Sequence, residues 1–167
     1  QIEISGGTIS IVASDDGINA AGGADSSSIG GRPGQGMFSS SSGQITISGG
    51  YIFVNASGDG IDSNGTLSVS GGVTLVAGPT DSANGVLDYE TSADVSGGVL
   101  IALGSSGMAQ GFTTASNQGA ILYNFTSQNS GTSFAVVNEN GTVVASFTSP
   151  KAFQSAVVTA PGIVCGS

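Results

Sequence analysis

The sequence predicts an all-β fold built from short repeated strands, and three observations predict it. The corner Ser-Gly-Gly recurs at serine positions 5, 48, 70 and 96, between short runs that alternate apolar and polar residues. Removing one insertion of about 20 residues leaves a repeat of about 22, a length typical of one turn of a parallel β-helix and too short for a propeller blade. No stretch of the chain has the spacing of an amphipathic helix.

Each predicted coil begins with strands that bury one face. In the first coil, Ile2 and Ile4 and then Ile9 and Ile11 alternate with polar residues, which is the period of a half-buried strand. The glycines of each corner allow backbone angles that are closed to other residues. The same pattern returns up to Gly111, so we predict that residues 1–111 form the coils. A Gly/Ser-rich insertion at residues 22–43 interrupts them, and loops of that kind are more often functional or flexible than structural.

A second apolar column faces away from the predicted core. If Ile52 and Val54 point inward, Tyr51 and Phe53 point outward. The equivalent outward residues of the next coils are also apolar, namely Val73, Leu75, Val99, Ile101 and Leu103. A column of this size needs a cover or a binding partner.

Residues 112–167 supply the expected cover. The ranges 120–126, 132–138, 142–148 and 154–160 read as ordinary strands, and Asn140-Gly141 is a strong hairpin turn. We therefore predict a C-terminal antiparallel β segment, within the same domain, that packs on the coils over the Tyr51 column. The alternative is a segment that only caps the end of the coils.

Composition excludes several classes of function. The 167 residues include eleven acids and two bases, for a formal charge of −9, and such a surface repels nucleic acid. There is no histidine and one cysteine, Cys165, which excludes Cys/His zinc sites, histidine-dependent nucleophilic catalysis and an internal disulfide. No apolar run approaches the roughly 20 residues of a membrane span. Because Gln1 lies inside a repeat, we expect the chain to be a section of a longer, processed protein.

Acidic residues gather after the second strand of the predicted coils. Aligning the glycines of two loops puts Asp16 beside Asp59. The same alignment puts Asn19 beside Asp62. Coils lie about 4.8 Å apart, so these carboxylates repel one another. The chain has almost no basic residues that could pair with them. Ca²⁺, which takes about six to eight oxygen ligands, relieves that repulsion. The alternative is that Asp and Asn serve only as turn formers. The candidate ligands are Asp15, Asp16, Asn19, Asp59, Asp62, Asp81, Asp88 and Glu90.

Several motifs together resemble one family. They are ASDDGINAAGG at 13–23, GGRPG at 30–34, ISGGYIFVNASGDGIDSNG at 47–65, GSSGMAQ at 104–110 and SFTSPKAFQSAVVTAP at 146–161. They look like the bacterial carbohydrate-binding-domain proteins with a pectate-lyase-like right-handed parallel β-helix. The resemblance implies a secreted or surface-attached protein that binds calcium and plant cell-wall polysaccharides such as cellulose or pectin-type acidic glycans, and it does not imply catalysis. It also implies that Asp15, Asp16, Asn19, Asp59 and Asp62 are calcium ligands, with Asp81, Asp88 and Glu90 weaker because their loop is longer.

Three functions follow, and we favour the first: an extracellular, calcium-binding, non-catalytic polysaccharide-binding module. An acidic glycan would be bridged through calcium, whereas a neutral glucan would need an exposed aromatic such as Tyr51 or Tyr89. For both tyrosines, burial under a loop or the C-terminal segment is the competing interpretation.

The second function is a structural or adhesive protein, a homo-oligomer or an end-to-end β-helix fibre, because open sheet edges invite stacking. The third is a polysaccharide lyase or hydrolase, since paired carboxylates serve glycoside hydrolysis. A lyase would want a basic residue close to its calcium. Arg32 lies in the insertion and Lys151 in the C-terminal segment, so neither lies in the repeated loops.

Overall fold

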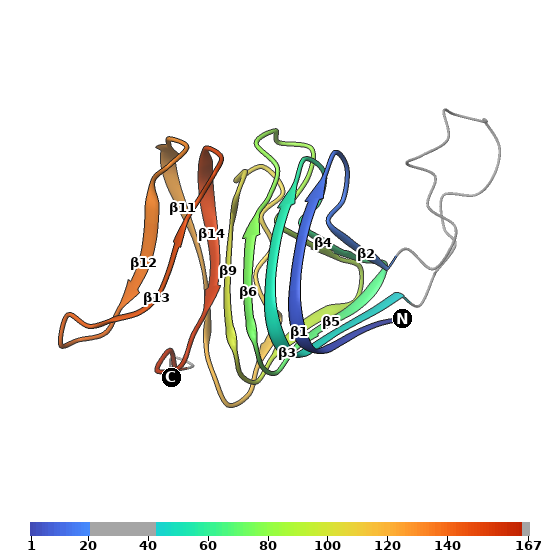
Figure 1. The fold of residues 1–167 in the computed structure, drawn as a ribbon, viewed down its shortest axis with the longest axis horizontal. Coiled ribbons are helices and arrows are strands. Elements are labelled where there is room, and N and C mark those ends of the chain that lie inside the picture. Colours follow the sequence, from blue (N-terminus) through green and yellow to red (C-terminus); the bar gives the residue numbers. More distant parts are fainter. Residues whose placement is uncertain (21–42, 165–167) are drawn as a thin grey trace.

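The computed structural model describes residues 1–20 and 43–164, and within them the chain is all β (Figure 1). The all-β class predicted from the sequence is therefore confirmed. The predicted insertion at 22–43, with Arg32, lies outside the described residues except for Gly43, and Cys165 also lies outside them. Among the described residues, no helix could cross a membrane.

Ten strands make up the predicted coil region and its continuation. They are β1 (Ile2–Ala13), β2 (Ile18–Ala20), β3 (Gly43–Ala56), β4 (Ile61–Ser63), β5 (Gly65–Val69), β6 (Val73–Ala77), β7 (Leu87–Tyr89), β8 (Ser92–Val95), β9 (Val99–Gly104) and β10 (Thr114–Ala115). All the pairs among them are parallel. The pairing runs to Ala115, so the parallel region extends past the predicted boundary at Gly111.

The parallel pairs form three ladders that run side by side along the molecule (Figure 1). The first half of β3 pairs with β5, which pairs with β8, and the second half of β3 pairs with β6, which pairs with β9. Strand β1 spans both halves of β3. A separate sheet joins β2, β4 and β7. Each ladder thus stacks equivalent segments of successive repeats.

Glycine makes the bend between the first two ladders. The second glycine of each Ser-Gly-Gly corner has a positive φ: 87° at Gly7, 95° at Gly50, 77° at Gly72 and 87° at Gly98. That region of backbone space is open to glycine and costly for other residues. The corner predicted from the sequence is therefore the point at which each repeat changes ladder.

The inward face of the strands is the main core. Ile52, Val54, Val76 and Leu100 are each fully buried and belong to one hydrophobic cluster. Their alternation with outward residues follows the strand period of two. The inward and outward faces predicted from the sequence are confirmed.

The C-terminal strands are antiparallel, as predicted. They are β11 (Ala120–Gln128), β12 (Ser133–Val137), β13 (Val143–Thr148) and β14 (Phe153–Thr159). Strand β14 pairs antiparallel with both β9 and β11, while β12 and β13 form a separate hairpin. Figure 1 shows this group on the side of the parallel stack next to β9.

These strands cover the outward apolar column. Leu75, Ile101 and Leu103 are buried together with residues of the C-terminal strands in a second hydrophobic cluster. The rings of Phe53 and Phe147 pack edge to face with centroids 6.2 Å apart. The predicted cover is confirmed for this part of the column. The prediction is wrong for Tyr51, which remains 47% exposed.

One buried polar group in the core yields a stability prediction. Thr74 is fully buried between the Ile52 and Leu100 positions of the stack, and its Oγ1 has no hydrogen-bond partner. We expect Thr74→Val to stabilise the protein by about 1–2 kcal/mol, because it removes an unpaired buried hydroxyl at nearly constant volume. Chemical denaturation measures this. Thr46→Val, on a partly exposed outward position, should stay within about 0.5 kcal/mol, and a destabilised Thr74→Val would show that the hydroxyl is satisfied.

Candidate metal centre

The β2–β4–β7 sheet stacks polar side chains in register. Asn19 pairs with Asp62, and Asp62 pairs with Asp88. Their neighbours Ile61 and Leu87 are fully buried, so the apolar and polar residues take opposite faces, as the strand period requires. The alignment of Asn19 with Asp62 that the sequence predicts is confirmed.

The loops that lead into this sheet bring two further carboxylates into the same column. The backbone N–H of Asp59 donates to Asp16 Oδ1 (2.8 Å), and the N–H of Gly85 donates to Asp59 Oδ1 (2.6 Å). Asn19 Nδ2 donates to Asp16 Oδ2 (2.7 Å). Asp16 and Asp59 therefore each accept a backbone bond from the next repeat, so these carboxylates tie successive loops together rather than closing a local turn.

Glycine lets the loops approach this closely. A Cβ placed on Gly58 would lie 2.4 Å from Asp16 Oδ1 and 2.9 Å from Asp15 Oδ1. Any larger residue at position 58 would therefore have to displace these carboxylates. The Gly-Asp alternation in Gly58–Asp62 is thus the sequence signal for a crowded acidic site.

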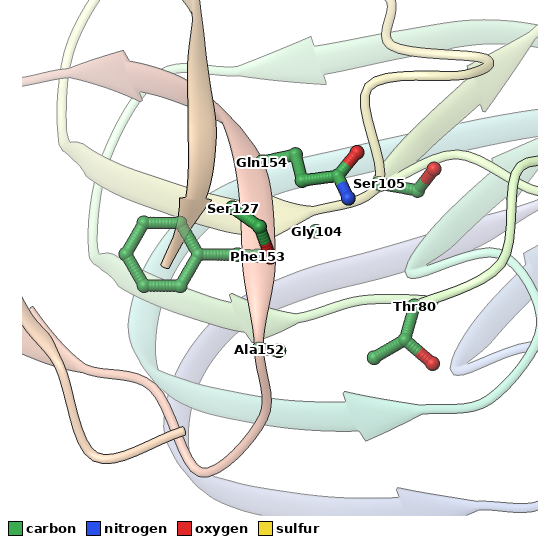
Figure 2. Close-up of a pocket in the computed structure, with 7 residues that line it drawn as sticks. All are labelled: Thr80, Gly104, Ser105, Ser127, Ala152, Phe153 and Gln154. Carbon is green, nitrogen blue, oxygen red and sulfur yellow. The ribbon is translucent and has the colours of Figure 1, made fainter. Parts of the chain in front are cut away.

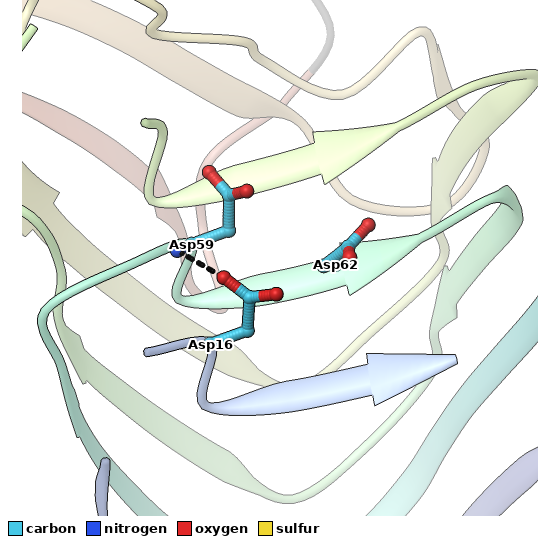
Figure 3. A group of neighbouring side chains, drawn as sticks. All are labelled: Asp16, Asp59 and Asp62. Carbon is cyan, nitrogen blue, oxygen red and sulfur yellow. Dashed lines mark hydrogen bonds between the residues drawn. The ribbon is translucent and has the colours of Figure 1, made fainter. Parts of the chain in front are cut away.

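Three of the carboxylates converge. Asp16, Asp59 and Asp62 each place an oxygen within 4.8 Å of the others, and all three are partly exposed (Figure 3). Asp16 comes from the loop before β2, whereas Asp59 and Asp62 come from the loop and strand of the next repeat. The donor atoms are all oxygens on loops and strand ends, a set that suits a hard cation such as Ca²⁺.

The electrostatics of the cluster favour binding of a cation. Burial, together with the charges of Asp88, Asp16 and Asp15, raises the pKa of Asp59 from 3.8 to about 6, although the bond from Gly85 N–H lowers it. Burial and the charge of Asp16 also raise the pKa of Asp88. The charged groups that act on both residues are acids, so a bound cation would neutralise a local excess of negative charge.

Two of the predicted ligands, Asp81 and Glu90, lie apart from this triad. Asp81 accepts bonds from Ala83 N–H (2.8 Å) and from Asn84 Nδ2 (3.3 Å) and is exposed, so it stabilises its own turn. Glu90 is exposed, and its backbone N–H donates to the Ser63 carbonyl (3.1 Å). The structure therefore brings Asp16, Asp59 and Asp62 together, flanks them with Asp15, Asn19 and Asp88, and leaves Asp81 and Glu90 outside.

The two candidate sugar-binding tyrosines have different surroundings. Tyr89 packs against the main core, and its hydroxyl donates to the Gly111 carbonyl (2.5 Å), so its ring does not offer an open platform. Tyr51 is 47% exposed on the outward face of β3. Of the pair, Tyr51 is the one whose ring is accessible to a sugar.

A pocket between the C-terminal strands and the parallel stack is too small for a sugar. Its lining residues are Thr80, Gly104, Ser105, Ser127, Ala152, Phe153 and Gln154 (Figure 2). Its cavity volume of about 20 Å³ suits a single water molecule. We therefore place no glycan there.

Lys151 makes a contact that the sequence does not predict. The residue lies in the C-terminal segment, between β13 and β14, and its Nζ donates to the carbonyl of Ala56, the last residue of β3 and a neighbour of the Asp59 loop. Burial lowers the pKa of Lys151, while the charge of Asp81 raises it. The contact joins segments 95 residues apart, so hydrophobic periodicity gives no sign of it.

No family model, curated protein or solved structure matches the chain. The geometry of the acidic cluster and the motifs of the sequence therefore carry the inference about function.

The raised pKa of Asp59 predicts how stability depends on pH in the absence of metal. A carboxyl whose pKa is higher in the folded state binds protons more tightly there, so the folded state gains stability as pH falls through about 6 toward the unfolded value near 3.8. We expect the melting temperature in chelator to rise when pH is lowered from about 7.5 to about 5. Asp59→Asn, which keeps an acceptor for Gly85 N–H, should flatten this rise. A melting temperature that falls over the same range in both proteins would contradict the assignment.

Proposed function

We propose that this protein is an extracellular, calcium-binding, non-catalytic module that binds plant cell-wall polysaccharides through a parallel β-helix. The observation that carries the proposal is the convergence of Asp16, Asp59 and Asp62, whose oxygens lie within 4.8 Å of one another. The resemblance of the sequence motifs to bacterial carbohydrate-binding-domain proteins supports the glycan partner and the extracellular location.

The proposed architecture is a right-handed parallel β-helix of about 22 residues per coil. Support comes from the three parallel ladders, in which equivalent segments of successive repeats pair in register. A connection between parallel strands of one sheet is right-handed in about 98% of known cases. The same hand is therefore the one we propose here.

Calcium would bind across two repeats. Asp16 and Asp59 each use an oxygen to accept a backbone N–H, but a carboxylate has about four lone-pair positions, so capacity remains for a cation. Asp62 supplies a third carboxylate from the adjacent strand. Ca²⁺ tolerates irregular, flexible oxygen shells, whereas Mg²⁺ demands a near-octahedral one. Calcium is accordingly the cation that we propose for this site.

The bound cation would determine which polysaccharide the protein prefers. A bound Ca²⁺ reverses the sign of the local charge, so it can bridge the carboxylate cluster to the carboxylates of an acidic glycan. A neutral glucan has no such anchor and would instead stack on an exposed ring, for which Tyr51 is available. Acidic pectin-type glycans are therefore the first ligand class and neutral glucans the second.

A second candidate function, assembly into oligomers or fibres, is favoured by one observation. Strand β11 ends the order of the large sheet, carries no charged residue, and exposes Ile121 (47%) and Tyr123 (59%). Unpaired edges with apolar side chains are prone to pair with another chain.

A catalytic function would need a base close to the cation site, and the charged groups that act on Asp59 are acids. We therefore propose no reaction.

Calcium should raise the melting temperature of the native protein. A ligand that binds only the folded state stabilises it by about 2.7 kcal/mol when present at a hundred times its Kd. We expect a clear upward shift in millimolar Ca²⁺ relative to chelator, a smaller shift in Mg²⁺, and loss of the calcium shift in Asp59→Asn and Asp62→Asn. The control is Asp81→Asn, which removes a carboxylate outside the cluster and should keep the full shift. If calcium leaves the melting temperature of the wild-type protein unchanged, these aspartates do not bind it and serve only to shape the loops.

Glycan retention should separate the two binding modes. On immobilised polygalacturonate we expect calcium-dependent retention that is lost in chelator and in Asp62→Asn, because the cation forms the bridge. On cellulose we expect retention that does not need calcium and that falls in Tyr51→Ala. A protein that binds neither material but sediments as concentration-dependent multimers would replace this proposal with the assembly function.

A further inference from the structure

The turn between β13 and β14 makes a polar contact with the parallel stack. Lys151 lies in this turn, and its ammonium donates to the Ala56 carbonyl at the end of β3. The turn itself is fixed locally, because Ser149 Oγ donates to the Lys151 carbonyl (2.7 Å) and Ser149 is 1% exposed. The ammonium is thus held at a defined place on the coils.

The register of the parallel ladder explains why Ala56 needs this donor. One repeat earlier, Ala13 pairs with Ala56, and the Ala13 carbonyl accepts the N–H of Ser57, one residue beyond its partner (3.1 Å). In the next repeat Asn55 pairs with Ala77, so the same rule assigns the Ala56 carbonyl to the N–H of residue 79. Residue 79 is proline, which has no N–H.

The missing bond would be costly at this position. Ala56 is fully buried, and a buried carbonyl without a donor loses its hydration with no compensation. A charged donor forms a stronger bond than a neutral amide, and Asp81, two residues after Pro79, favours the charged form of Lys151 against burial. The ammonium therefore satisfies a backbone acceptor that the ladder leaves open.

We propose that Lys151 is a latch that takes the place of the N–H that Pro79 lacks and so locks the C-terminal strands onto the parallel stack. Release of β12, β13 and β14 would uncover the outward apolar residues Leu75 and Ile101, which are buried in the cluster with these strands, and Phe53, which packs against it. The latch does not depend on a bound cation, so it stands or falls separately from the proposed function.

Amide hydrogen exchange of residues 153–159, measured by mass spectrometry in chelator, tests the latch. These amides are protected by pairing of β14 with β9 and β11. Lys151→Met keeps the aliphatic stem but removes the donor, and we expect roughly tenfold faster exchange. Gln154→Ala, which removes an exposed neighbour that accepts a bond from Ser106, should change exchange less than about twofold.

Two further variants test whether the donor is what matters. Lys151→Arg retains N–H donors on a long stem and should stay close to the wild-type rate. In a Pro79→Ala background the backbone N–H is restored, so adding Lys151→Met should accelerate exchange less than about threefold. The latch is overturned if Lys151→Met leaves exchange unchanged or if Lys151→Arg opens the segment as much as Lys151→Met. An equal acceleration by Lys151→Met in the wild-type and Pro79→Ala backgrounds would also overturn it.

Discussion

Pairing in register between parallel repeats is the constraint on which the rest of this structure depends. Backbone N–H groups of one repeat donate to carbonyls of its neighbour, as Gly17 does to Asp59 (2.8 Å) and Gly60 to Gly85 (3.0 Å). Because this pairing fixes the rise to about 4.8 Å, equivalent side chains lie directly above one another. Apolar positions become continuous core columns, and acidic positions become carboxylate stacks.

The stack of acidic side chains is a consequence of that register. Lining up Asp62 with Asp88 and Asp16 with Asp59 satisfies the backbone, yet it places like charges together. Burial, together with these charges, raises the pKa of Asp59 to about 6. Backbone N–H bonds to the carboxylates offset part of the repulsion. Local conflict of this kind, retained in an otherwise consistent fold, is typical of functional sites.

The outward face shows the same constraint acting on apolar residues. Stacking makes a continuous apolar column of Leu75 and Ile101, which the C-terminal strands bury. Those strands add to the sheet through the pairing of β14 with β9 and are tied to the stack by Lys151, at the register position where Pro79 interrupts the regular bonding. The C-terminal strands are therefore held to the stack in three ways: by pairing with β9, by burial of the apolar column and by the bond from Lys151.

The sequence by itself determined the all-β class, the inward and outward faces, the glycine corners and the pairing of Asn19 with Asp62. It could do so because a period of two and a repeat of about 22 residues are visible directly in the order of residues. It also indicated the C-terminal cover through the exposed apolar column. Only the tertiary structure decided which acids converge. Asp81 lies in the longer loop between β6 and β7, where it bonds Ala83 N–H, and Glu90 follows β7, whereas Asp16 and Asp59 precede the strands of that sheet. The tertiary structure likewise decided that Tyr89 packs against the core, that Tyr51 stays exposed, and that Lys151 reaches Ala56. These outcomes depend on where side chains distant in sequence meet, and residue order does not encode such contacts locally.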